Sequence, residues 1–236
     1  MFAAPLAVTT IGPEPAAIRS PAYMGLDYPG SIANGTTVSL PASGMSFVVP
    51  ALSGPADRSV ALWTGRGEKY QQAQSLREGV ILTRTAKGTS VKAWYDTVGF
   101  SIAYPPEPYS WDLAKAHVFN HPLSVGDTVT ATITNKGGGI WAFSFTDKNP
   151  KNAKASWAQS VNVTANPAGI DADIALETTT PVSDRPTMGA VTVHSVPSTG
   201  PNAFRLGGDN LSSDWGGVKR PSLTLNTPYT LTVKLP

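Results

Sequence analysis

The stretch VGDTVTATITNKGGGIWAFSFTDKN, residues 125–149, shows most clearly which fold class this sequence predicts. From Thr128 to Thr134, threonines alternate with apolar residues, which is the period of a β-strand that buries one face. The following NKGGG supplies residues that tolerate a positive φ, as a tight turn requires, and a second strand pattern starts at Ile140. The stretch therefore predicts two β-strands joined by a turn.

The same kind of pattern covers most of the chain. Segments rich in β-branched and aromatic residues are bounded by Gly, Pro, Asn, Asp or Ser, and they lie at residues 36–52, 59–65, 79–85, 90–98, 128–135, 140–147, 160–165, 189–196 and 222–235. Many short strands separated by turn residues are the signature of an all-β, antiparallel β-sandwich or jelly roll. One segment, SWDLAKAHVF at 110–119, is a candidate for one or two helical turns.

A chain of 236 residues can form one β-sandwich domain with a full core. We expect an extended Pro-rich arm at 1–22, the sandwich at 23–199, and a loop with added C-terminal strands at 200–236. Four prolines prevent a helix in the arm, and Pro-rich sequence does not collapse by itself. We therefore expect the arm to lie along a protein partner in an assembly.

Composition narrows the function classes. Charged residues make up 14% of the chain, the formal net charge is +2, and no more than two Lys or Arg are adjacent. We therefore expect no nucleic-acid partner and no membrane insertion. The chain has no cysteine, which excludes disulfides, thiolate metal sites and cysteine nucleophiles. Its N-terminus has no basic residue before a short apolar run, so we expect synthesis in the cytoplasm rather than secretion.

A series of segments between residues 35 and 196 resembles the glutamic peptidases called eqolisins. In order along the chain, these segments are SFVVPALSG, SVALWTGRGE, LREGVILT, AWYDTV, LSVGDTVTATITNKGGGIWAFSFTDKN, ADIALE and DRPTMGAVTV. The family has an acid-active, concanavalin-like sandwich of two long antiparallel sheets, so the resemblance implies that fold here. WTG stands where the family has Trp-Val-Gly, and AWYD stands for Ala-Trp-Tyr-Glu.

Both catalytic positions of the family are substituted in the matching segments. The family uses a Gln and a Glu that face each other across the concave sheet. The Glu activates a water as general base, and the Gln amide helps to hold that water and to stabilise the oxyanion. The segment LREG is similar to Leu-Gln-Thr-Gly and places Arg77 at the Gln position. The segment ADIALE is similar to Ala-Glu-Trp-Ile-Val-Glu and places Asp173 at the catalytic Glu and Glu177 at the second acid.

These substitutions change the chemistry that the pair can perform. A guanidinium stays ionised and only donates hydrogen bonds, whereas an amide also accepts them. An aspartate holds its carboxylate one methylene further back than a glutamate, and an error near 1 Å in position costs about a hundredfold in rate. We therefore expect Arg77 and Asp173 to form a structural salt bridge rather than a catalytic pair. If the alignment slips by one residue, Glu78 becomes the partner, and two acids would share a proton.

Other motifs carry weaker signals. His117 and His121 are four residues apart, but no glutamate lies between them in the zinc-protease arrangement, so we expect no metal site and no cofactor. Six aromatic residues either line a sheet face for sugar binding or fill the core, namely Trp63, Trp94, Tyr95, Trp111, Trp141 and Trp157. The best candidates for ligand binding are in YPPEPYSW, where prolines hold an extended loop with Tyr104, Tyr109 and Trp111.

Three function classes remain after this reasoning. We expect a non-catalytic structural or adhesive sandwich in a larger assembly, namely a bacteriophage virion protein such as a minor tail or capsid-surface component. The virion assignment is an analogy, because a fold does not imply a function. The alternatives are a carbohydrate-binding module that contacts a cell-surface carbohydrate, and an acid-acting peptidase related to the eqolisins.

Overall fold

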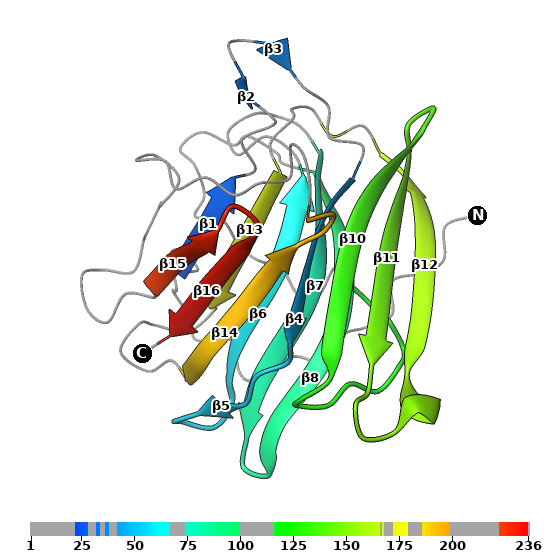
Figure 1. Ribbon diagram of the computed structural model, residues 1–236. Helices are drawn as coiled ribbons and strands as arrows, with labels where there is room; N and C mark the ends of the chain where they lie inside the picture. Colours follow the sequence, from blue (N-terminus) through cyan, green and yellow to red (C-terminus); the bar gives the residue numbers. More distant parts are fainter. Residues whose placement is uncertain are drawn as a thin grey trace.

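The computed structural model describes residues 22–27, 32–33, 36–37, 42–66, 74–99, 116–165, 167, 172–178, 186–198 and 222–235. Within these residues, two antiparallel sheets face each other, so the predicted all-β sandwich is confirmed (Figure 1). The arm before residue 22 lies outside the described residues. In the described part of the chain, no helix is long and apolar enough to cross a membrane.

The first sheet has six strands and carries the positions that resemble the eqolisin catalytic pair. Its order is β1 (Ala22–Asp27), β13 (Ala172–Thr178), β6 (Arg58–Arg66), β7 (Gln74–Thr85), β8 (Gly88–Gly99) and β9 (His117–Val118). Every neighbouring pair is antiparallel. Strands β7 and β8 form a long hairpin around the turn at Ala86 and Lys87.

The second sheet has eight strands. Along its main path the order is β12 (Trp157–Thr164), β11 (Ile140–Lys148), β10 (Thr128–Gly137), β4 (Ala42–Val48), β14 (Thr187–Ser195), β16 (Thr230–Leu235) and β15 (Ser222–Thr227), and β5 (Leu52–Ser53) pairs with β14. Thus the C-terminal strands β15 and β16 extend this sheet beyond β14. The remaining described elements are β2 (Ile32–Ala33), β3 (Thr36–Thr37) and the 3-10 turn η3 (Ala153–Ala155).

The hairpin predicted from residues 125–149 is present as β10 and β11. Thr128 pairs with Lys148 at one end, and Gly137 pairs with Ile140 at the other. The three glycines of the turn all have positive φ, between 60° and 83°, which explains why this position needs glycine. Apart from the exposed Ile140 at the turn, the apolar residues of both strands are buried, and the threonines of β10 are only half-buried, as strand alternation predicts.

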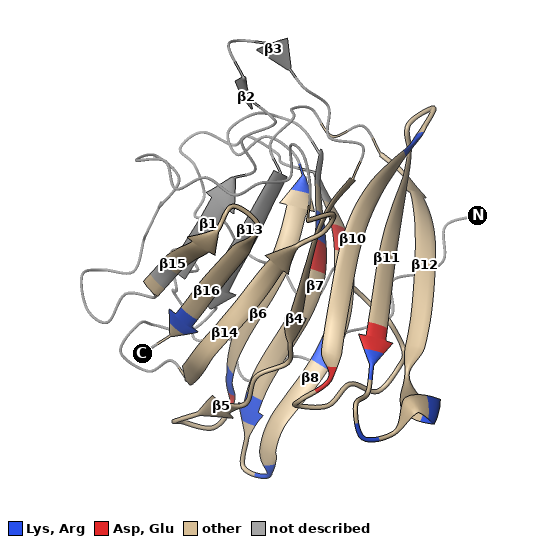
Figure 2. Ribbon diagram, viewed as in Figure 1, with Lys and Arg blue, Asp and Glu red and all other residues tan. Residues whose placement is uncertain are grey.

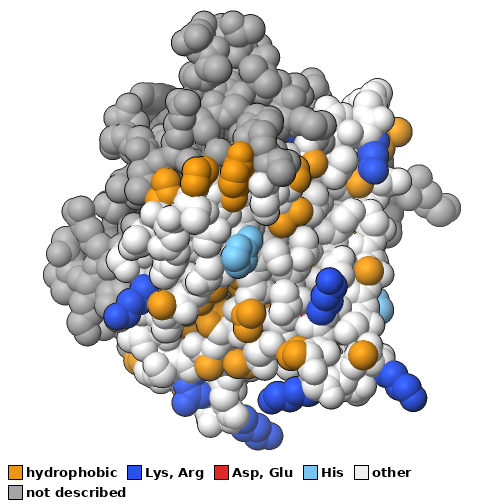
Figure 3. Space-filling view, viewed as in Figure 1, with side chains coloured by type: hydrophobic (Ala, Val, Ile, Leu, Met, Phe, Trp, Pro, Cys, Tyr) orange, Lys and Arg blue, Asp and Glu red, His pale blue; other side chains and the backbone are white. Residues whose placement is uncertain are grey.

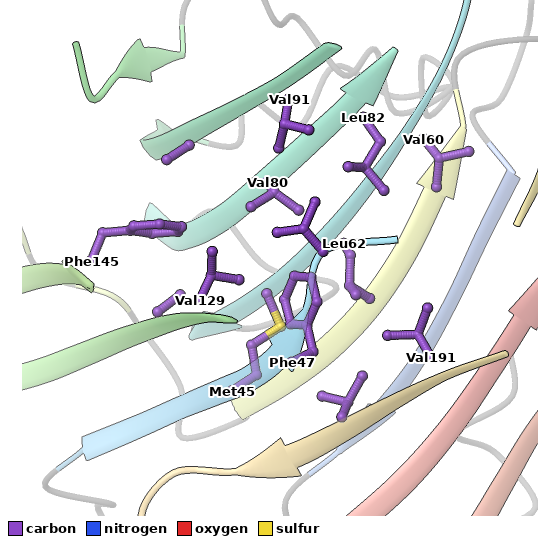
Figure 4. Packing of buried hydrophobic residues seen from close by; sticks show 14 of the residues in the cluster. Met45, Phe47, Val60, Leu62, Val80, Leu82, Val91, Val129, Phe145 and Val191 are labelled. Carbon is purple, nitrogen blue, oxygen red and sulfur yellow. The ribbon is translucent and has the colours of Figure 1, made fainter. Parts of the chain in front are cut away.

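The core lies between the two sheets, where their inner faces meet. Met45 and Phe47 of β4 pack against Leu62 of β6 and Val80 of β7, and all four side chains are buried (Figure 4). Because apolar surface removed from water contributes about 25 cal/mol per Å², this interior is the main source of stability. It also determines which face of each strand points outward.

The described part of the helical candidate is extended instead of helical. His117 and Val118 form β9 at the edge of the six-stranded sheet, where they pair with Trp94 and Tyr95 of β8. Phe119 follows, and its backbone N–H donates to the carbonyl of Ala93 at 3.1 Å. The ring of Phe119 is buried among other aromatic rings, so tertiary packing outweighs the local helix preference. Residues 110–115 lie outside the described residues.

Gly79 allows strands β6 and β7 to approach closely, so we predict that Gly79→Ala destabilises the fold. A Cβ atom at this position would lie 2.6 Å from the Cα of Trp63 and still nearer to the carbonyl oxygen of Leu62. Backbone atoms cannot move aside cheaply, so we expect a loss of about 1–3 kcal/mol in the free energy of unfolding, measured by urea denaturation.

The matched control is Gly189→Ala on β14, where an added Cβ would meet no atom within 4 Å. We expect that substitution to change the free energy of unfolding by no more than about 0.5 kcal/mol. Equal losses in the two variants would contradict the described contact between β6 and β7.

Candidate functional site

The register of four strands places Arg77 and Asp173, the two positions that resemble the eqolisin catalytic pair, in one row across the six-stranded sheet. Asp173 of β13 pairs with Gly65 of β6. Gly65 in turn pairs with Arg77 of β7, and Arg77 pairs with Asp96 of β8. For Asp173, only the backbone position is described. The row therefore contains Asp173 and Arg77, the two positions that resemble the eqolisin catalytic pair, and also Asp96.

This row belongs to the face of the six-stranded sheet that points away from the core. Leu62, Leu76 and Val80 project into the interior between the sheets. Residues one position away project to the other side, where Trp63 and Trp94 form a separate buried cluster with Ala61, Ile81 and Ala116. Arg77 therefore lies on the outer face, in the same row as Asp96.

Arg77 is engaged in an ion pair and two aromatic contacts. Its NH2 group donates to Oδ2 of Asp96 at 3.0 Å, and the two side chains are 12% and 7% exposed. The guanidinium carbon lies 5.7 Å from the ring centroids of both Trp63 and Trp94. These distances are in the range of cation–π attraction, so two indoles and one carboxylate hold the guanidinium in place.

Asp96 is the partner of Arg77 that sequence reasoning missed. The predicted partner was Asp173, whose side chain lies outside the described residues, so that pairing stays a prediction. Asp96 was noted only as the acid in AWYD. Its pairing with Arg77 follows from the register of the β7–β8 hairpin, which no single segment reveals.

Burial and the charge of Arg77 shift the pKa of Asp96 in opposite directions, and burial has the larger effect. It raises the pKa of Asp96 above the ordinary value, and the charge and hydrogen bond of Arg77 offset part of the rise. His117 contributes a smaller offset. The ion pair is thus costly to bury, and removing one partner would leave the other charge uncompensated.

An indole fills the space over the middle of the row. A Cβ atom at Gly65 would collide with Cζ3 of Trp63 and would lie 3.1 Å from its Cε3. Gly65 is the position between Arg77 and Asp173. This contact explains why a glycine is required at position 65.

Glu78 lies on the opposite face of the sheet from Arg77, inside the core. It pairs with Thr64 of β6 and Tyr95 of β8, and its side chain is fully buried. Neither carboxyl oxygen has a hydrogen-bond partner among the described residues. Burial raises the pKa of Glu78 well above its ordinary value, and the backbone of Thr132 and Ser144 on the facing sheet offsets only part of the rise. Burial therefore disfavours the charged form of Glu78.

The other predicted positions are separate from this row. Glu177 pairs with Ala61, four residues along β13 from Asp173, which corresponds to about 13 Å between the two Cα atoms. Tyr104, Tyr109 and Trp111 lie outside the described residues.

The two histidines stack on different aromatic rings. The ring centroid of His117 lies 5.0 Å from that of Tyr95, and the ring centroid of His121 lies 4.6 Å from that of Trp157. Among the described residues, no group of three potential metal-binding side chains lies together. The described tryptophans pack within the fold: Trp63, Trp94 and Trp141 are buried, and Trp157 is half-buried.

Comparison with known proteins shows a likeness in fold. A structure of scytalido-glutamic peptidase with a peptide-based transition-state analog matches with a TM-score of 0.54 and 13% sequence identity, over 92% of this chain and 97% of that chain. A structure of the same peptidase with a transition-state analog inhibitor matches with a TM-score of 0.53 and 13% identity, over the same shares. SCP-B, a member of the eqolisin family in complex with the tripeptide Ala-Ile-His, matches with a TM-score of 0.53 and 12% identity, again over 92% and 97%.

These likenesses establish the eqolisin-like sandwich that the sequence resemblance implied. At such low identity they concern the fold alone. No protein-family model matches the chain. No curated protein matches it either.

The buried Glu78 should make the protein more stable in acid than at neutral pH. Because its folded pKa is raised, its contribution to stability is fully present below the unfolded pKa, near 4.5, and is lost as the pH rises through the folded pKa. We predict that Glu78→Gln, which cannot ionise, weakens this pH dependence and raises the free energy of unfolding at neutral pH. Urea denaturation across a pH series measures both effects.

The exposed Asp57 provides the control for this experiment. We expect Asp57→Asn to leave the pH profile of stability close to that of the unmodified protein, because the Asp57 side chain is solvated. Parallel profiles for the unmodified protein and Glu78→Gln would show that Glu78 is not desolvated.

Proposed function

We propose that this chain is a non-catalytic structural or adhesive β-sandwich subunit of a larger assembly. One observation carries the non-catalytic part: Arg77 is paired with Asp96 at 3.0 Å and lies beside the rings of Trp63 and Trp94. The resemblance to the eqolisins implies that position 77 is where the family has its catalytic Gln.

The chemistry of this arrangement favours a structural role. A guanidinium cannot accept a hydrogen bond from water as an amide oxygen does. Its charge is also compensated by Asp96, so it is poorly placed to stabilise a new oxyanion. The ion pair with Asp96 and the contacts with Trp63 and Trp94 join strands β6, β7 and β8 around Arg77. These contacts support a site that stabilises the sheet rather than one that binds a water for attack on a peptide.

The assembly part of the proposal rests on the sequence. Residues 1–22 include Pro5, Pro13, Pro15 and Pro21, and such a segment gains order by lying along a partner. We propose a virion as the assembly, with the chain as a minor tail or capsid-surface component of a bacteriophage. The low charge and the absence of cysteine are compatible with this assignment.

An acid-acting peptidase is the second candidate, because the fold resembles solved glutamic peptidases. We predict that the purified chain does not cleave a denatured protein at acid pH, since position 77 carries a guanidinium paired with Asp96 instead of a neutral amide. Product peptides are measured by mass spectrometry against a blank without protein.

The variant Asp173→Ala makes this result interpretable. If acid cleavage is detected and Asp173→Ala abolishes it, the non-catalytic proposal is wrong. If cleavage is detected and persists in Asp173→Ala, we attribute it to a contaminating peptidase, which the variant carries through the same purification. The proposal that the chain is non-catalytic then stands.

We also predict that residues 1–22 take part in association. Light scattering should show a defined multimer for the full chain and a monomer for a chain that lacks residues 1–22. Circular dichroism of the shortened chain controls for loss of the fold. Monomers in both cases would contradict self-association through the arm and would favour the peptidase and carbohydrate-binding alternatives.

A further inference from the structure

The surface of the described region is far more positive than the net charge of the chain suggests. Of the five carboxylates whose burial is described, four are buried, namely Glu78, Asp96, Asp127 and Asp147. Asp57 is the exposed carboxylate among the residues whose burial is described. Several lysines are exposed by contrast, namely Lys87, Lys136, Lys148, Lys151, Lys154 and Lys234.

All of these lysines except Lys136 lie toward one end of the sandwich, as does the half-buried Lys92. The pairing of Thr128 with both Lys148 and Val48 puts the end of β11 beside the end of β4. On the other sheet, the β7–β8 turn lies at the same end, because the N–H of Leu52, just after β4, donates to Oγ1 of Thr89, just after that turn, at 2.8 Å. Lys and Arg gather at this end in Figure 2, and basic side chains line the lower margin of the molecule in Figure 3.

We call this region the lysine end and define it by Lys87, Lys92, Lys148, Lys151, Lys154 and Lys234. Lys136 lies at the opposite end, in the β10–β11 turn.

The loop between β11 and β12 presents three of these lysines on an ordered backbone. Oδ1 of Asn149 accepts hydrogen bonds from the N–H groups of Lys151 and Asn152, at 2.9 and 2.8 Å. Asn152 caps the short η3 turn by accepting from the N–H of Lys154 at 3.2 Å. Such side-chain caps reduce the entropy that the loop would lose on binding a partner.

The acids at this end compensate only part of the lysine charge. Asp57 is the exposed carboxylate here, and its N–H donates to the carbonyl of Arg84 near the β7–β8 turn at 2.7 Å. Oδ2 of Asp127 accepts the N–H of Ser124 at 2.8 Å. Asp147 is 2% exposed, and burial, assisted by the charge of Asp127, raises its pKa to about 6. Among the described residues, none of the lysines at this end forms an ion pair. Their ammonium groups are therefore available to an anionic partner.

We propose that the lysine end binds an anionic polysaccharide, a flexible chain that carries carboxylate groups along its length. Lys148 on β11 and Lys234 on β16 are separated by four strand spacings, or about 19 Å. One small anion cannot reach both lysines, whereas a polymer can contact them together. Lysine ammonium groups act as point charges on flexible stems, which suits spaced carboxylates.

The features that recognise nucleic acids are engaged internally at this end. Arg84 donates to the backbone carbonyls of Thr85 and Gly88, and Arg58 donates to that of Asp57. The ring of Trp157 stacks on His121 on one side and on Phe145 on the other, at centroid distances of 4.6 and 5.3 Å. Among the described residues of the lysine end, these arginines are engaged with backbone carbonyls instead of being free to bind a phosphate with two N–H groups. The ring of Trp157 is likewise engaged with other rings and not open for stacking on a base, so we favour the polysaccharide. This proposal does not require the non-catalytic assignment above.

Binding to immobilised polygalacturonate tests the proposal. We expect the full chain to bind at low salt, to weaken strongly at physiological salt, and not to bind neutral dextran. Lys151→Ser should weaken binding about fivefold, the effect of one lysine near an anionic surface. The triple variant Lys148→Ser, Lys151→Ser, Lys154→Ser should lose most of the binding.

Lys136→Ser is the matched control, because it removes one exposed lysine from a turn at the opposite end. When both are compared at 0.1 M salt, it should bind polygalacturonate within about twofold of the unmodified chain. The Debye length is then about 10 Å, whereas the two ends of the β10–β11 pair are nine residues, or about 30 Å, apart. Circular dichroism verifies that each variant is folded. Equal losses for Lys136→Ser and Lys151→Ser, no binding of the unmodified chain, or displacement by duplex DNA or anionic phospholipid vesicles at lower concentration than by free polygalacturonate would overturn the proposal.

Discussion

Every position discussed above depends on two sheets that each bury one face against the other. Since side chains alternate along a strand, burying Leu76 on β7 turns Arg77 to the outer face and Glu78 into the core. On β6 the same constraint sends Leu62 inward and Trp63 outward. A slip of one residue would exchange the two faces of a strand, so the apolar core decides which polar groups become neighbours.

This constraint leaves the chemistry of the outer row open in a fold similar to that of glutamic peptidases. In this chain a guanidinium, a carboxylate and two indoles meet in and beside that row. The strands keep the same backbone arrangement as long as each side chain fits the face of the sheet on which it lies. The fold therefore limits where a reactive pair can lie but does not determine whether the pair is reactive.

Burial also changes the electrostatics of the molecule. Carboxyl groups withdrawn from water at Glu78, Asp96 and Asp147 have raised pKa values, so part of the negative charge counted in the sequence is suppressed or hidden. Lysines stay at the surface because their long stems carry the ammonium group into water. The charge that a partner meets is thus set by the fold more than by the composition.

The sequence alone determined the fold class, because strand alternation and turn residues are local signals. The hairpin from Thr128 to Lys148 could be read from its own residues. The sequence also shows an arginine at position 77 and an aspartate at position 173, and these two residue types already suggested a non-catalytic pair. Only the tertiary structure decided that Asp96 pairs with Arg77, since that contact depends on the register of a long hairpin.

Three further features were decided by tertiary packing. Residues 117 and 118 are extended because pairing with β8 and burial of Phe119 outweigh a local helical preference. Glu78 has a raised pKa because packing of the two sheets removes its carboxyl group from water, and the facing residues come from distant segments. Lysines from position 87 to position 234 lie at one end of the sandwich because antiparallel strands place alternate connections at the same end. No local sequence pattern shows which connections share an end.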